Sequence, residues 1–245
     1  MFREYGKLST IVYEHTKPVG RSLQGDIEYY TSKLENISGR VLEAGVGTGR
    51  MLIPFIQSGI TVDGVDLSSD MLKQCELNME EYNVTANLYH QDLSELSLPH
   101  TYGAIVMPTG SFCLIDRKES KKVLDNFYNH LNDGGKIIID LEMPSYFREN
   151  EVTSNSFHLS QDTGIVLTSY SEKMDWLAQK TSYISKYELV KSGKVVDTEI
   201  SNFTLYWYGI EEFMMQLSLS RYTNISYEIG YGSDQSEIIT FTAYK

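Results

Sequence analysis

The stretch Val41-Leu-Glu-Ala-Gly-Val-Gly-Thr-Gly-Arg50 decides the fold of this 245-residue chain. Its first residues have the composition of a short buried strand, and Gly45, Gly47 and Gly49 then alternate with other residues. Glycine lacks a Cβ and accepts positive φ angles, so a nucleotide can approach this backbone closely. A helix that begins near Thr48 would point its free amides at the ligand. The stretch therefore predicts a nucleotide-binding loop between a strand and a helix.

The spacing of the glycines separates this loop from other nucleotide-binding loops. A dinucleotide-binding loop has the pattern G-x-G-x-x-G, whereas this chain has G-x-G-x-G with Arg50 at the last position of the dinucleotide pattern. A Walker loop is excluded, because no Gly-Lys-Ser/Thr follows. The stretch resembles motif I of the class I S-adenosylmethionine-dependent methyltransferases, in which an acidic residue precedes G-x-G-x-G. Glu43 is that acid here.

The next two predicted strands also end in carboxylates. Residues 60–66 have the pattern of an apolar strand that ends at Asp66, about twenty residues beyond the loop, where an acid can hold two ribose hydroxyls. A third strand ends at Asp92. The resemblance implies that Asp66 holds the ribose of the cofactor and that Asp92 lies beside the adenine amine. It also implies that Leu67 and Met71 flank the adenine, although Met71 equally fits a core position at helical spacing.

The resemblance predicts one cofactor site at the ends of several strands. Its members are Tyr13, Glu43, Ala44, Gly45, Gly47, Gly49, Asp66, Leu67, Met71, Gln91, Asp92, Leu93 and Pro108. Residues 5–14 match a family pattern, Y-x-x-L-A-x-x-Y-D, that folds over the cofactor and places Tyr13 nearest its methionyl group. The alternative for this segment is an amphipathic helix that packs on a sheet.

The loop after the fourth predicted strand narrows the substrate. The strand breaks at Pro108, and the residues that follow are small, Thr-Gly-Ser111. Methyltransferases that act on nucleobase amines or glutamine side chains tend to carry Asn/Asp-Pro-Pro-aromatic here, so such a substrate is disfavoured. The family usually has an acid where this chain has Gly103, a departure at a structural position.

Composition limits the partners further. A formal net charge of −12 opposes association with nucleic acid, which depends on Lys and Arg to neutralise phosphates. No apolar run is long enough to span a bilayer, and the amino terminus lacks the apolar core of a signal peptide, so we expect a cytoplasmic protein without a membrane partner. Cys75 and Cys113 lie far apart and the histidines fall singly, so no disulfide framework or metal site is expected.

The order of the predicted elements is typical of a doubly wound α/β fold with a seven-stranded, mostly parallel sheet. Strands are expected at about 41–45, 60–66, 86–91, 103–107 and 136–141, and helices at about 25–36, 48–58, 69–82 and 117–131. A helix at 209–217 and a terminal hairpin, 225–229 and 238–244, would complete it. Pro54 falls inside one of these helices and is expected to kink or shorten it.

The composition changes after Pro144 to a Thr-, Ser- and Tyr-rich pattern with a period of two. An antiparallel sheet of about four strands is expected, including 165–170, 174–190 with a bend and 194–208. The predicted domains are therefore a cofactor-binding α/β domain, 1–150 with 209–245, and an inserted β subdomain, 151–208. The insertion could be a lid that shapes the acceptor pocket or, because an added sheet exposes edges, the surface through which two copies form a homodimer.

Methyl transfer from a sulfonium is an in-line displacement with an activated leaving group, so alignment is the main task of the protein. No general base is obligatory, and no catalytic residue is assigned; Tyr13, His15 and Tyr146 are pocket candidates only. The expected activity is transfer of a methyl group from S-adenosylmethionine to a nitrogen, an oxygen or a carboxylate of a small molecule. Two alternatives remain open: a module that binds the cofactor without catalysis, and a nicotinamide-dependent oxidoreductase.

Overall fold

The computed structural model describes residues 5–232 and 237–245. The chain divides into two compact units, one of residues 19–143 with 207–245 and the other of residues 1–18 with 144–206. The boundaries between these units differ from the expected ones: the inserted segment is 144–206 and was expected at 151–208. In particular, the first 18 residues belong with the inserted sheet and not with the α/β unit, because the amino-terminal helix packs on that sheet.

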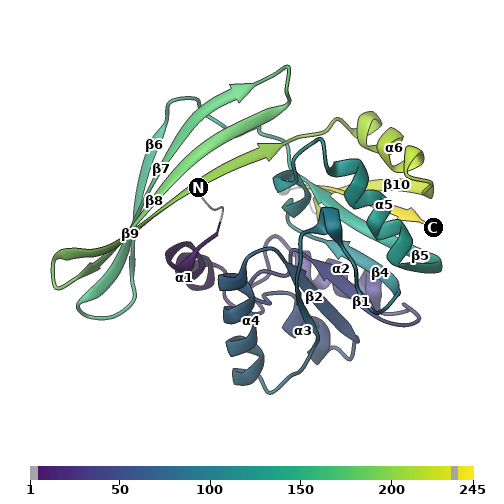
Figure 1. The fold of residues 1–245 in the computed structure, drawn as a ribbon, viewed down its shortest axis with the longest axis horizontal. Coiled ribbons are helices and arrows are strands. Elements are labelled where there is room, and N and C mark those ends of the chain that lie inside the picture. The colour runs from purple at the N-terminus through teal and green to yellow at the C-terminus, as the bar shows by residue number, and fades with distance from the viewer. Residues whose placement is uncertain (1–4, 233–236) are drawn as a thin grey trace. The chain divides into compact units, whose positions relative to one another are not determined.

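The α/β unit is built on a seven-stranded sheet with the order β10-β11-β5-β4-β1-β2-β3 (Figure 1). Its strands are β1 (Val41–Ala44), β2 (Val62–Asp66), β3 (Leu88–His90), β4 (Tyr102–Met107), β5 (Leu131–Leu141), β10 (Thr223–Ile229) and β11 (Ile239–Tyr244). Strands β1 to β5 are parallel, and β11 runs antiparallel to both β5 and β10. The fold class expected from the sequence is confirmed.

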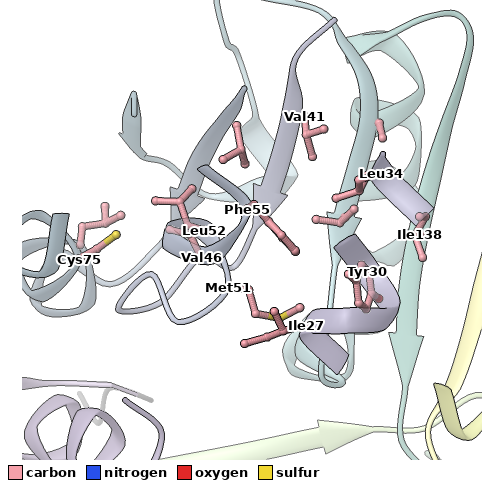
Figure 2. Close-up of a cluster of buried hydrophobic side chains, with 14 residues drawn as sticks. Ile27, Tyr30, Leu34, Val41, Val46, Met51, Leu52, Phe55, Cys75 and Ile138 are labelled. Atoms are coloured by element: carbon pink, nitrogen blue, oxygen red, sulfur yellow. The ribbon is translucent and has the colours of Figure 1, made fainter. Parts of the chain in front are cut away.

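One face of this sheet is covered by three helices, α2 (Asp26–Leu34), α3 (Leu52–Gln57) and α4 (Ser69–Glu81). Their apolar side chains meet those of β1, β2, β4 and β5 in one buried cluster, in which Phe55 of α3 and Tyr30 of α2 are the largest members (Figure 2). Strands buried on both faces have near-continuous apolar sequences, as β1 and β4 do.

Helices α5 (Ser120–His130) and α6 (Ile210–Leu219) lie on the opposite face. Phe213 of α6 packs against Phe241 of β11, which pairs with Ile139, whereas Ile138 faces the cluster on the other side. The two helices are adjacent, because Arg117 just before α5 forms an ion pair with Glu212 of α6. Three short 3-10 helices complete the unit: η1 (Leu93–Glu95), η2 (Ser111–Leu114) and η3 (Gly230–Gly232).

The helix after the glycine loop differs from the expectation. It begins at Leu52 and not near Thr48, because the backbone takes positive φ at each of the three glycines and passes through turns before a helix can start. Pro54 is therefore the third residue of α3 and lies in its first turn, where a backbone amide has no partner within the helix. The helix is shorter than expected, as one of the two outcomes predicted for Pro54 had it.

Two further boundaries also differ. The helix expected from residue 117 begins at Ser120, because the Asp116 side chain accepts a hydrogen bond from the Lys118 amide and closes a turn before it. The segment 174–190 is not one bent strand: β7 ends at Asp175, and the chain turns through Gln179, which has a φ of 49°, into the next strand. The hairpin turn at Ser192 and Gly193 is confirmed, with φ angles of 50° and 77°.

The second unit is an antiparallel sheet with the order β6-β7-β8-β9 (Figure 1). Its strands are β6 (Val152–His158), β7 (Thr163–Asp175), β8 (Lys180–Lys191) and β9 (Lys194–Tyr206). Helix α1 (Lys7–Thr16) packs on it, with Leu8 and Val12 against Ile165 and Tyr187. Amphipathic packing on a sheet was one of the two readings that the sequence left open for this segment.

The start of α1 is tied to β9 by Glu199. Its carboxylate accepts hydrogen bonds from the backbone amides of Leu8 and Ser9, at 2.7 and 3.1 Å, and from the Ser9 hydroxyl at 2.6 Å. A carboxylate at a helix amino terminus satisfies free amides and complements the helix dipole. In the described residues, no helix is long and apolar enough to cross a membrane.

Candidate functional site

The glycine loop lies at the carboxyl ends of β1 and β2, where doubly wound folds bind ligands. The amides of Gly45 and Val46 donate to the carbonyl of Val65, which ties the loop to β2. A Cβ at Gly49 would lie 2.8 Å from the Cys75 sulfur of α4, so this glycine is required for packing. Each glycine has a positive φ, which gives the loop a shape that other residues rarely adopt.

Asp66, at the end of β2, holds this loop in place. Its Oδ2 accepts from the Gly47 amide and its Oδ1 from the Ser68 amide, both at 2.8 Å. Burial raises the pKa of the Asp66 carboxyl, and the hydrogen bonds from Ser68 and Gly47 oppose that rise. A carboxylate has about four acceptor positions, so two of these bonds leave room for further donors such as hydroxyl groups. The residue predicted to hold a ribose thus also positions the loop.

Glu43 is the second carboxyl of the site and is fully enclosed. It lies on β1 and is 2% exposed, and its Oε2 has no hydrogen-bond partner among the described residues. Burial raises the pKa of Glu43 to about 8; Arg50 opposes this rise, while Asp26 and Asp66 add to it. Glu43 is therefore mostly protonated at neutral pH, and a cation at its free oxygen would favour its ionised form.

A buried ion pair connects the end of the loop to the start of α2. Arg50 Nη2 donates to Asp26 Oδ2 at 2.6 Å, with side chains that are 4% and 0% exposed, and Arg50 Nη1 donates to the Arg21 carbonyl. Asp26 Oδ1 also accepts from the amides of Leu23 and Ile27, at the start of α2. This pair was not predicted from the sequence, in which its one local signal is an arginine directly after the last glycine.

The other predicted residues lie in the segments that follow β2 and β3, and they differ in exposure and in contacts. Leu67 is exposed, whereas Met71 is buried in the structure. The Asp92 carboxylate accepts from the Ser94 amide and caps η1, which begins at Leu93. The Gln91 side chain both donates to and accepts from the backbone of Ser97. The structure thus gives Asp92 and Gln91 local roles, and their contacts with a ligand stay predictions.

The turn after β4 lies beside the glycine loop, close to Gly45. Beyond the buried Pro108, Thr109 and Gly110 take φ angles of 52° and 71°. A left-handed conformation costs a β-branched residue about 1–2 kcal/mol. The Thr109 amide donates to Asp140 Oδ2 at 2.7 Å, and a Cβ at Gly45 would lie 3.4 Å from that of Ser111. Neither Asp140 nor the strain at Thr109 carried a local signal in the sequence.

Ala44, the last residue of β1, is fully buried. The three residues predicted in the amino-terminal and linking segments belong to the second unit. Tyr13 and His15 lie on α1, and Tyr146 is highly exposed. Their roles toward a cofactor or an acceptor stay predictions.

Removing one partner of the buried ion pair is expected to be costly. In Asp26→Ala, Arg50 is left as an uncompensated buried charge, and the free energy of unfolding should fall by about 3–5 kcal/mol. Asp125→Ala is the control, because Asp125 pairs with Lys121 on the exposed surface of α5, where such pairs contribute about 0.3–0.5 kcal/mol. Urea unfolding measures both variants, and equal losses would contradict the assignment.

Part of the chain is similar in sequence to known methyltransferases. Residues 41–135 match the family model described as a methyltransferase domain. A glycine/sarcosine N-methyltransferase of Aphanothece halophytica is 30% identical over 122 residues, 49% of this chain and 46% of that protein. The chain spans about half the length of several curated relatives that it matches.

Solved structures match over nearly the whole chain. A S-adenosylmethionine-dependent methyltransferase from Clostridium acetobutylicum ATCC 824 aligns with a TM-score of 0.77 at 19% identity, covering 96% of each chain. The sugar N-methyltransferase KedS8 from Streptoalloteichus sp ATCC 53650 has a TM-score of 0.77 at 16% identity, covering 98% of this chain and 94% of that one. Residues 41–135 therefore resemble a methyltransferase domain, and the chain has the fold of the class I, Rossmann-like S-adenosylmethionine-dependent methyltransferases.

Proposed function

We propose that this protein is an S-adenosylmethionine-dependent methyltransferase that acts on a small molecule. The observation that carries the proposal is the free, buried Oε2 of Glu43 beside a glycine loop that is fixed by Asp66. A buried acceptor without a partner is costly, so a ligand with a donor at this place would remove that cost. The matched methyltransferase domain, residues 41–135, includes all of these residues.

The residues present fit this cofactor. The methionyl ammonium supplies the cation that Glu43 lacks, and the ribose diol supplies donors for the remaining acceptor positions of Asp66. The adenine would lie near the exposed Leu67, which follows Asp66 at the carboxyl end of β2. The glycines leave the loop without side chains on its ligand side, which permits close approach of the backbone. Leu67 and Met71, with Gln91, Asp92, Leu93 and Pro108, are proposed as the rest of the pocket.

S-Adenosylmethionine, when bound, supplies a methyl group on a positively charged sulfur. That sulfur departs readily as a neutral thioether when the methyl group is transferred. The contribution of the chain is then to hold donor and acceptor in line and to exclude water, which can lower the barrier by about 7–11 kcal/mol. Glu43 and Asp66 would fix the two ends of the donor, and the turn at Thr109 would bound it on the β4 side. An acceptor with a free lone pair needs no general base in this scheme.

A small molecule with a nucleophilic nitrogen is the proposed acceptor, with oxygen and carboxylate acceptors as alternatives. The names of two matched proteins, a glycine/sarcosine N-methyltransferase and a sugar N-methyltransferase, support nitrogen. The net charge of −12 argues against nucleic acid, and Pro108-Thr-Gly-Ser111 lacks the tetrad found with planar amide and base substrates.

The four-stranded sheet is proposed to contribute to the acceptor site and to pair two copies of the chain. Its strands β6 and β9 are edges, and an exposed edge can pair with another chain. Exposed apolar residues on it, such as Trp176 and Ile200, suit either role. A cytoplasmic location stays a prediction.

Binding of S-adenosylhomocysteine tests the cofactor assignment. By titration calorimetry we expect micromolar affinity in the wild type and its loss in Asp66→Ala, because that variant removes both the ribose acceptor and the anchor of Gly47. Asp70→Ala, on the first turn of α4, is the control and should bind normally. NADH is titrated in parallel. Binding of NADH without binding of S-adenosylhomocysteine would favour an oxidoreductase.

Proton release tests the role of Glu43. In the unliganded protein the pKa of this carboxyl is raised from 4.5 to about 8, so its contribution to stability is complete below pH 4.5 and is lost as the pH rises through 8. An ammonium at Oε2 would lower that pKa, and binding at pH 7 should release a proton.

Calorimetry in two buffers of different ionisation enthalpy measures this release. In Glu43→Gln we expect no release and an affinity for S-adenosylhomocysteine that is about tenfold lower, because a charged hydrogen bond is lost. Equal proton release by the wild type and the variant would exclude Glu43 as the partner of the ammonium.

A further inference from the structure

On the basis of the function proposed above, we propose that Asp140 is a positioning residue for the cofactor: it locks the turn after β4 against the glycine loop. Asp140 lies near the end of β5 and is completely buried. It is therefore shielded from the ligand side and acts through the backbone that it holds. The residue that it holds is Thr109, 31 positions earlier in the chain.

The turn needs an external anchor because its conformation is unfavourable. Thr109 has a φ of 52°, a region that β-branched residues avoid. The next residue, Gly110, has a φ of 71°, and a Cβ there would lie 2.8 Å from Glu142 Cγ, so this side of the turn is tightly packed. Within the turn, Ser111 donates to the Pro108 carbonyl from its amide and its hydroxyl, at 3.3 and 3.0 Å. These bonds shape the turn, and Asp140 attaches its backbone at Thr109 to β5; further along, Cys113 of η2 is bonded to the backbone of Glu142.

Asp140 accepts three hydrogen bonds from three separate segments. Oδ2 accepts from the Thr109 amide at 2.7 Å and from the Tyr231 hydroxyl at 2.5 Å, and Oδ1 accepts from the Thr240 hydroxyl at 2.7 Å. Strand β11 carries Thr240, and η3 carries Tyr231. One carboxylate thus joins the turn after β4 to the antiparallel edge of the sheet.

The locked turn faces the cofactor loop directly. A Cβ built on Gly45 would lie 3.4 Å from Ser111 Cβ and 3.9 Å from Met107 Cε, so the space between the loop and the start of η2 is no larger than one methyl group needs. Gly45 follows Glu43 by two residues and belongs to the loop that Asp66 anchors from the other side. A shift of the turn would therefore change the space beside Gly45, in the loop that the cofactor is proposed to contact.

The surroundings of Asp140 suit an ionised acceptor. Tyr29 and Tyr30 of α2 face it together with Tyr231, and Asp26 and Arg50 act on Tyr231 with opposite signs. Burial raises the pKa of Asp140 to about 6, and the Tyr231 and Thr240 hydroxyls, the Thr109 amide and Tyr30 oppose the rise. Cys113 of η2 faces it as well, and Asp140 raises the pKa of that thiol. At neutral pH the Asp140 carboxylate is ionised and accepts all three hydrogen bonds. A proton on Oδ2 would displace one of the two donors to that oxygen, the Thr109 amide or the Tyr231 hydroxyl.

Four variants test this role with S-adenosylhomocysteine as the probe at pH 7.5. Asp140→Ala removes the anchor, and its dissociation constant should rise about tenfold. Asp140→Asn can still accept from Thr109 and should bind within about threefold of the wild type. Adding Thr109→Gly to Asp140→Ala relieves the strain at φ 52° and should recover at least about half of the lost binding free energy. A purely structural role of Asp140 would not be rescued at residue 109.

The fourth variant, Tyr231→Phe, removes one donor to Asp140 and should weaken binding about threefold. Its matched control is Tyr222→Phe, which removes another buried tyrosine hydroxyl bond, to the Leu124 carbonyl, far from this carboxylate in the hydrogen-bond network. Equal binding by both tyrosine variants, or wild-type binding by a folded Asp140→Ala, would overturn the assignment.

Amide NMR on the wild type completes the test even if Asp140→Ala does not fold. The Thr109 resonance should shift with a midpoint near pH 6, lose that titration in Asp140→Asn, and respond to S-adenosylhomocysteine. A Thr109 resonance indifferent to the ligand would overturn the role in binding. Failure of the wild type to bind S-adenosylhomocysteine would overturn the proposed function as well, whereas tight wild-type binding that no Asp140 variant changes would overturn this inference alone.

Discussion

The hydrogen bond from the Gly47 amide to the Asp66 carboxylate is the interaction on which the candidate site depends. It joins a loop with three left-handed glycines to the end of the neighbouring strand, and the bonds of Gly45 and Val46 to Val65 extend the same attachment. The loop cannot relax outward without breaking these bonds. On the inner side, Cys75 leaves no room for a side chain at residue 49, because a Cβ there would lie 2.8 Å from its sulfur. The geometry of the ligand side is therefore set before any ligand binds.

Buried ionisable groups gather around this loop. Glu43, Asp26, Arg50 and Asp140 are all nearly or completely buried, and the same unit also buries Asp63 of β2, which pairs with Arg40. Desolvation of such groups is unfavourable, and the structure offsets it differently at each. Asp26 is paired with Arg50, Asp140 receives three donors, and Glu43 keeps an oxygen without a partner. Glu43 is the exception, and its free oxygen lies where the ammonium group of the proposed cofactor would bind.

The sequence predicted what depends on local pattern. The glycine loop, the strand that ends at Asp66 and the doubly wound order follow from short periodic segments, and the structure has them. The strand expected to end at Asp92 ends at His90, because Asp92 caps η1. The start of α3 was wrong because propensity does not reveal how many residues a left-handed turn occupies before a helix. The break between β7 and β8 was missed because Gln179 supplies a positive φ without being glycine or asparagine.

The missed site residues share another cause. Arg50 reaches Asp26 across 24 residues, and Asp140 reaches Thr109 across 31, so neither contact has a sequence spacing to reveal it. Each becomes visible only when the sheet places α2 and β5 beside the loops. Contacts of Gln91, Asp92 and Tyr13 with a ligand stay predictions, because the structure shows only their contacts with the protein.

A crystal structure with bound S-adenosylhomocysteine would test the proposed roles of Glu43 and Asp66. The proposed site predicts the ligand amino group within hydrogen-bond distance of Glu43 Oε2 and the ribose hydroxyls on Asp66, with the Gly47 bond to Asp66 retained. A ligand whose amino group is bound elsewhere, with Glu43 still buried and unpartnered, would contradict it.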